Sequence, residues 1–129
     1  MNEHGLNGLA GVLVWTAADR FDAMAAFYVD VLGLSPRTRR AGFVNFELGT
    51  QRLTVAVHDG VVGEARDPLR IMVNLSVDDI ERAHRQLVGR GVRFVRAPEV
   101  ETWGGRVATF ADPDGNVVQL MQLVERSSA

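Results

Sequence analysis

Residues 105–121 read Gly105-Arg-Val-Ala-Thr-Phe-Ala-Asp-Pro-Asp-Gly-Asn-Val-Val-Gln-Leu-Met121, two apolar and β-branched runs on either side of an Asp-Pro-Asp-Gly turn. This pattern is typical of two antiparallel strands joined by a tight turn. The segment Gly42-Phe-Val-Asn-Phe46, followed by a turn and then Leu53-Thr-Val-Ala-Val57, has the same pattern. The hairpin therefore occurs twice. An internal repeat of this size decides the architecture of the whole chain.

Each hairpin follows a strand and a helix. In the first half the strand covers 11–16, and the helix 19–33 has apolar residues at helical spacing, with Asp19 as N-cap and Gly33 closing its end. In the second half the strand 71–77 precedes an amphipathic helix over 78–88. Further strands are predicted at 43–48, 53–57, 92–96, 105–110 and 117–123, and a short one is allowed near 34–38.

The length of 129 residues and the hydrophobic content of 47% are sufficient for one core. We therefore expect a single domain over 1–129, with module 1 at about 8–58, an exposed connection at 59–70 and module 2 at about 71–124. Because each half is too small for a stable core alone, the two sheets should pack on each other or on a partner chain.

Composition excludes several classes of function. A net charge of −2 gives no basic face for nucleic acid. The absence of cysteine excludes disulfides and thiol nucleophiles, and because all 14 basic residues are arginine, a lysine Schiff base is excluded too. No apolar run approaches the roughly 20 residues of a membrane span, and residues 1–8 do not resemble a signal peptide, so a cytoplasmic location without membrane contact is expected.

Three motifs occur in a characteristic order: Phe27-Tyr-Val-Asp-Val-Leu-Gly-Leu34, Leu75-Ser-Val-Asp78, and Trp103-Gly-Gly-Arg-Val-Ala-Thr-Phe-Ala-Asp-Pro-Asp-Gly-Asn116. With them the chain resembles the glyoxalase/bleomycin-resistance (vicinal oxygen chelate) superfamily over residues 8–124. The resemblance implies an α+β fold in which two tandem βαβββ modules form a curved, partly open barrel around a cavity. It also implies a homodimer.

Members of this superfamily use the cavity either for metal-dependent catalysis or for metal-free sequestration of antibiotics. Catalytic metals need imidazole or carboxylate ligands that converge from several strands, and a thioether or a neutral amide is a poor substitute. We therefore expect no metal and no cofactor. The ligand positions that the resemblance implies are occupied by Leu13 (or Val12), Thr54 (or Ala56), Met72 and Gln119.

Strand alternation predicts which side chains face the cavity. In 53–58, Leu53, Val55 and Val57 should pack under the helix, which leaves Thr54, Ala56 and His58 on the concave side. The same reasoning applied to 72–77 and 117–121, with two rim tryptophans, predicts an apolar pocket that holds a hydrophobic or aromatic molecule. The predicted ligand contacts are Trp15, Thr54, His58, Met72, Asn74, Ser76, Trp103, Gln119 and Met121.

Three functions are compatible with this pocket. The first is a metal-independent protein that binds a hydrophobic or aromatic small molecule, such as an antibiotic. The second is a metal-independent enzyme of lyase or isomerase type, in which His58 or a glutamate at the cavity mouth is the general base. The third is a regulatory or interaction domain with a vestigial cavity. The other histidines do not rebuild a metal site, because His4 is in the amino-terminal tail and His84 is on the second helix.

Overall fold

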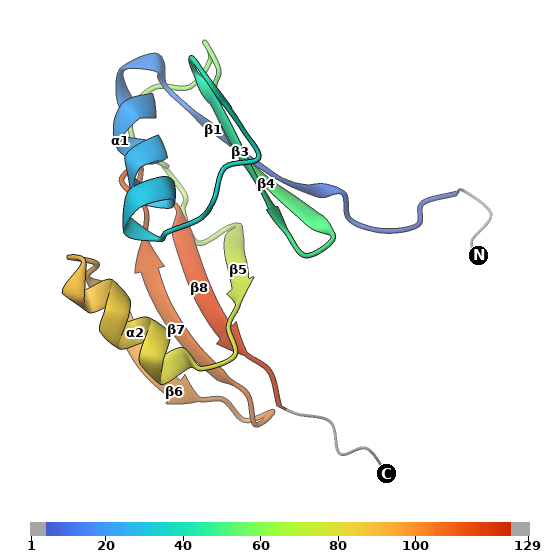
Figure 1. Cartoon of the computed structure of the whole chain (residues 1–129), viewed down its shortest axis with the longest axis vertical. Coiled ribbons are helices and arrows are strands. Elements are labelled where there is room, and N and C mark those ends of the chain that lie inside the picture. Colours follow the sequence, from blue (N-terminus) through green and yellow to red (C-terminus); the bar gives the residue numbers. More distant parts are fainter. Residues whose placement is uncertain (1–4, 125–129) are drawn as a thin grey trace.

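Two four-stranded sheets, each covered on one face by a helix, form the protein (Figure 1). The computed structural model describes residues 5–124. In both sheets the first strand of the module pairs in parallel with the last, which confirms the repeat and the α+β class. The first sheet, in spatial order, contains β1 (Gly11–Thr16), β4 (Gln51–Val57), β3 (Phe43–Leu48) and β2 (Thr38–Arg40). The second contains β5 (Met72–Ser76), β8 (Val117–Gln122), β7 (Arg106–Ala111) and β6 (Phe94–Val100).

The first helical segment differs from the single helix expected over 19–33. It comprises a 3-10 turn, η1 (Ala18–Arg20), then α1 (Phe21–Ala26), then a π-helical turn, η2 (Phe27–Val31). The prediction of Asp19 as N-cap is wrong, because Asp19 lies inside η1 and the N-cap position of α1 is Arg20, which makes no side-chain cap. The segment ends as predicted before Gly33, whose φ is 75°.

The second helix, α2 (Ile80–Gly89), begins with a side-chain cap. Asp79 is its N-cap, and the Asp79 carboxylate accepts a hydrogen bond of 3.1 Å from the backbone N–H of Arg82. Ile80 and Leu87 lie on the buried face of α2, as the amphipathic pattern predicts. The helix packs beside β6, β7 and β8 (Figure 1).

Apolar side chains on the helix-facing sides of both sheets form the core. Leu53 and Val55 are buried under α1, and Val118 and Leu120 are buried under α2, as alternation predicts. The two clusters are continuous, since Val73 of β5 belongs to the cluster around α1 and Phe27 packs against both. The modules are therefore joined through their helix-covered sides.

A buried polar cluster joins the modules at a second place. The Tyr28 hydroxyl donates a 2.7 Å hydrogen bond to Asp112, and the Thr16 hydroxyl donates one of 2.6 Å to Asp114. Arg20 forms an ion pair with Asp114 and donates to the carbonyl oxygen of Pro113 at 2.7 Å. Burial raises the pKa of the Asp112 carboxyl. We call these groups the inter-module clamp: Thr16, Arg20, Tyr28, Asp112, Pro113 and Asp114.

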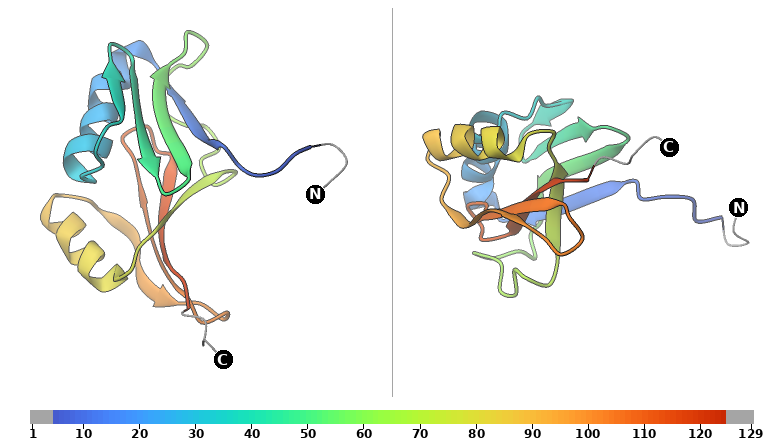
Figure 2. Two further views of the ribbon diagram at one scale, coloured as in Figure 1. Left: turned by 45° about the vertical axis from the view of Figure 1, so that its right-hand side comes forward. Right: turned by 90° about the horizontal axis from the view of Figure 1, so that it is seen from below.

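The amino-terminal side of β1 lies unusually close to β4. A Cβ on Gly11 would lie 2.2 Å from the carbonyl oxygen of Arg52, so only glycine fits there. Before Gly11 the chain leaves the sheet as an extended arm (Figure 2). Among the described residues 5–124, no helix is long and apolar enough to cross a membrane.

Candidate functional site

The faces of the two sheets that point away from the helices carry most of the predicted contacts, and we call them the open faces. On the first sheet, Leu13 and Trp15 of β1 are 48% and 44% exposed, large fractions for such apolar side chains. In register, Leu13 lies opposite Thr54, and Trp15 lies opposite Ala56. This face thus presents apolar side chains beside the single hydroxyl group of Thr54, which suits contact with an apolar molecule.

His58 follows β4 directly and contacts Trp15. The two rings meet edge to face with centroids 5.0 Å apart. The backbone N–H of Gly60 donates a 2.9 Å hydrogen bond to Nδ1 of His58, so the lone pair of Nδ1 is already engaged and the neutral ring carries its proton on Nε2. A general base needs a free lone pair. This geometry supports a binding contact for His58 more than the base role.

On the second sheet, Asn74 and Gln119 lie opposite each other in register. The Gln119 amide donates to the Asn74 side-chain oxygen at 3.2 Å. Ser76 lies opposite Met121, and Met72 lies opposite Val117. The face therefore presents a paired amide between two sulfur-containing side chains, with the remaining amide hydrogens and oxygen available to a ligand.

Trp103 lies at the tip of the connection between β6 and β7. Hydrogen bonds between the backbones of Glu101 and Gly105 (2.8 Å) and of Gly104 and Glu101 (2.9 Å) close this turn. The indole packs directly over Gly105, where a Cβ would lie 1.7 Å from a ring carbon. Trp103 is 50% exposed, so it is held in place by the turn and still offers a ring face or edge to solvent.

The donor groups on the open faces do not fit a divalent metal. Leu13 has no donor atom, and the Gln119 amide is bonded to Asn74. Glu47 of β3 forms ion pairs with Arg37 (3.0 Å) and Arg52 (3.8 Å). Within residues 5–124, no three His, Asp or Glu side chains gather as a candidate ligand set, while His4 lies outside the described residues. His84 packs edge to face against Phe94 at 4.5 Å.

The structure divides the predicted contacts between the two sheets. Trp15, Thr54 and His58 lie on the first sheet or at its edge. On the second sheet or at its edge lie Met72, Asn74, Ser76, Trp103, Gln119 and Met121.

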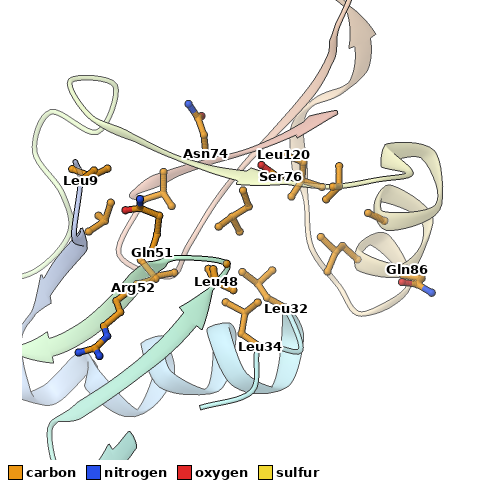
Figure 3. Close-up of a pocket in the computed structure, with 18 of the residues that line it drawn as sticks. Leu9, Leu32, Leu34, Leu48, Gln51, Arg52, Asn74, Ser76, Gln86 and Leu120 are labelled. Atoms are coloured by element: carbon orange, nitrogen blue, oxygen red, sulfur yellow. The ribbon is translucent and has the colours of Figure 1, made fainter. Parts of the chain in front are cut away.

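A pocket of about 610 Å³ lies between the modules (Figure 3). Of the predicted contacts, Asn74 and Ser76 line it. The residues that sequence reasoning missed lie at the end of η2, beside the β3–β4 turn and on or just after α2; apolar spacing could have pointed to the leucines, and no sequence signal pointed to the polar residues. They include Leu32, Leu34, Leu48, Gln51, Gln86 and Arg90.

Comparisons with known proteins agree with this architecture. The sequence model of the Glyoxalase/Bleomycin resistance protein/Dioxygenase superfamily matches residues 13–120. A bleomycin resistance protein from Klebsiella pneumoniae is 33% identical over 111 residues, covering 79% of this chain and 83% of that protein. A glyoxalase/bleomycin resistance protein/dioxygenase structure from Nocardioides has a TM-score of 0.75 at 21% identity, covering 94% of this chain and 86% of that one. A glyoxalase/bleomycin resistance protein structure from Catenulispora acidiphila has a TM-score of 0.65 at 26% identity, covering 93% and 100%.

Proposed function

Since the chain belongs to the Glyoxalase/Bleomycin resistance protein/Dioxygenase superfamily, we propose that it is a metal-independent protein that binds a hydrophobic or aromatic small molecule on its open faces. The observation that carries this proposal is the exposure of large apolar side chains there. Leu13 and Trp15 of β1 are 48% and 44% exposed, and Trp103, in the turn between β6 and β7, is 50% exposed. Exposed apolar groups beside a few polar ones are typical of ligand sites.

The similarity to a bleomycin resistance protein supports an antibiotic as the ligand. Bleomycin carries planar heteroaromatic groups, and such groups stack on indole rings. The Asn74 and Gln119 amides supply hydrogen bonds that fix the orientation of a polar substituent. The donor set supports metal independence, because leucine, methionine and paired amides are poor ligands for Zn, Ni, Mn or Fe.

A second copy of the chain completes this proposed site. The open faces belong to two separate sheets, and β1 and β5 are edge strands of their sheets. An exposed edge beside exposed leucine and tryptophan is a surface that a two-fold partner covers. A cytoplasmic homodimer with the ligand enclosed between open faces is thus part of the proposal.

The test is a titration with metal-free bleomycin, followed by calorimetry and by tryptophan fluorescence. Wild type should bind saturably, and EDTA should leave the affinity unchanged. Trp103→Ala should weaken binding about tenfold or more, since a buried tryptophan contact contributes upwards of about 1.4 kcal/mol. Trp15→Phe leaves Trp103 as the only tryptophan, so its emission should shift on saturation.

Val88→Ala is the matched control, because Val88 is a half-exposed apolar residue on α2, away from the open faces. Its affinity should equal that of wild type. A failure of bleomycin and of a panel of aromatic antibiotics to bind, or an affinity lost on adding EDTA, would contradict the proposal.

A further inference from the structure

The pocket between the modules shares Asn74 and Ser76 with the open face of the second sheet, and its other lining residues lie outside the proposed antibiotic site. We propose that it binds an elongated aliphatic carboxylate that carries a hydrogen-bond donor at its far end. Its walls come from both modules: Leu32 and Leu53 from the first, Val73, Leu75 and Leu87 from the second. The volume of about 610 Å³ lies within the range of small-molecule sites, roughly 300–1,000 Å³.

The centre of the pocket is aliphatic, without an aromatic side chain among its lining residues. Leucine and valine side chains converge on it from β1, β4, β5, α2 and the end of η2 (Figure 3). A hydrocarbon chain fits such walls better than a planar ring does. Each buried methylene should tighten binding about fourfold.

One end of the pocket is cationic. Arg90 follows α2, and its Nη1 donates a 2.9 Å hydrogen bond to the carbonyl oxygen of Val31, which holds the guanidinium at the end of η2. Within residues 5–124, Arg90 has no ion-pair partner, and no acidic side chain lines the pocket. The other lining arginine, Arg52, turns away from the pocket (Figure 3) and lies 3.8 Å from Glu47. Arg90 is thus placed to receive a carboxylate.

The other end of the pocket holds a buried acceptor. Gln51 lies with Leu9 and Asn74 at the end opposite Gln86 (Figure 3), and Gln86 is one turn before Arg90, whose backbone N–H donates to the Gln86 carbonyl oxygen at 3.2 Å. The Gln51 side-chain oxygen is buried and has no hydrogen-bond partner among the described residues. A buried acceptor without a partner is destabilising, and a ligand hydroxyl or amide N–H would satisfy it. The pocket is therefore complementary to a ligand with an anionic group at one end and a hydrogen-bond donor at the other.

Calorimetric titration with dodecanoate and 12-hydroxydodecanoate below their micellar concentrations, and with dodecanol below its solubility limit, tests the inference. We expect 12-hydroxydodecanoate to bind more tightly than dodecanoate, and dodecanol to bind about tenfold more weakly than dodecanoate. Octanoate should bind far more weakly than dodecanoate, following the fourfold factor per methylene.

Three variants and one control separate the contributions. Arg90→Met should weaken dodecanoate binding about tenfold and abolish its advantage over dodecanol, whereas Arg85→Met, an exposed arginine on the same helix, should change nothing. Gln51→Leu should remove the advantage of the hydroxyl group. Ala83→Leu adds an aliphatic side chain to the pocket wall, so the protein should stay folded and lose dodecanoate binding.

Bleomycin binding should be the same in wild type and Ala83→Leu, so this inference and the proposed function fail independently. Absence of saturable carboxylate binding, or an Ala83→Leu affinity equal to that of wild type, would overturn the inference. If Ala83→Leu instead dissociates a dimer in sedimentation experiments while carboxylates fail to bind wild type, a second copy occupies the pocket and the inference is wrong.

Discussion

Tyr28 is the only tyrosine in the chain and is fully buried. Its hydroxyl donates to Asp112, and burial, followed by the negative charge of Asp112, raises the pKa of the phenol far above its ordinary value. The folded state therefore keeps the proton more tightly than the unfolded state. By linkage, this stabilisation is complete below the ordinary tyrosine pKa of about 10 and declines as the pH rises above it.

We predict that the folded protein shows no tyrosinate absorbance until it unfolds in alkali. Tyr28→Phe should lower the free energy of unfolding by about 1–3 kcal/mol at neutral pH, because Asp112 loses a hydrogen-bond donor. The variant should also lack the fall in stability that tyrosine ionisation causes above about pH 10. A spectrophotometric titration alongside circular dichroism checks this. Tyrosinate that forms near pH 10 while the circular dichroism is still native would show the prediction to be wrong.

Strand alternation predicted which side chains are buried, but it could not predict which polar side chains form hydrogen bonds with one another. Leu53, Val55 and Val118 are buried where the pattern expects them, since alternation is a local property of a strand. The role of Tyr28 could not be predicted in this way, because it contributes to helical apolar spacing like any aromatic residue. Its hydrogen bond reaches a residue 84 positions away, which local patterns do not encode.

The Asp-Pro-Asp-Gly turn between β7 and β8 is more than a hairpin turn. Asp112 accepts the backbone N–H groups of Asp114 (2.9 Å) and Asn116 (3.0 Å), which is ordinary turn chemistry. Asp114 is not needed to close the turn; its carboxylate accepts a hydrogen bond from Thr16 and forms an ion pair with Arg20, both in the other module. Asp114, the second aspartate of the turn, was therefore the one feature of the sequence that could have pointed to the inter-module clamp.

We predict an acid-side pH dependence that depends on Asp112. Burial raises its folded pKa above the ordinary value of about 3.9, so the folded state binds the proton more tightly. The stabilisation is fully present below about pH 3.9 and is lost as the pH rises through the folded pKa. Asp112→Asn should remove the contribution of Asp112 to the slope of stability against pH. Because an amide nitrogen then faces the donors of Asn116, the variant should also be less stable than wild type by about 1–3 kcal/mol at neutral pH.

Denaturant unfolding at a series of pH values measures both effects. Asp67→Asn is the control, since Asp67 is an exposed carboxylate in the connection and pairs only locally with Arg70. The control should keep the slope of wild type. An Asp112→Asn protein with an unchanged slope would contradict the assignment.

At the scale of elements, each predicted strand and helix has a counterpart in the structure, but the first helix is divided and the short strand expected near 34–38 lies at Thr38–Arg40. The first helix consists of η1, α1 and η2, and Arg20, at the N-cap position of α1, directs its side chain to Asp114 and Pro113 instead of capping. Strand β6 extends from Phe94 to Val100, beyond the predicted 92–96, because its pairing with β7 continues to Val100 past register shifts between Phe94 and Arg96 and between Arg96 and Glu99. Tertiary contacts, absent from local patterns, set these boundaries.

At the scale of the molecule, the sequence predicted the open faces but not the pocket between the modules. The repeat shows which residues share a face within one module. How two modules pack depends on contacts such as Val73 with the first core cluster, and these have no periodic signature. The pocket lined by Leu32, Gln51 and Arg90 therefore became visible only in three dimensions.

The assembly can be tested through the open face of the first sheet. If a second copy covers Leu13 and Trp15, wild type should sediment as a dimer at micromolar concentration. Leu13→Arg should dissociate it, since a guanidinium would be desolvated without a partner at the interface. Because Leu13 is 48% exposed in the single chain, the variant should lose little stability as a monomer. Val88→Arg, a half-exposed position on α2, should remain dimeric. A wild type that sediments as a monomer, or a Leu13→Arg protein that remains a dimer, would show that this face is not the interface.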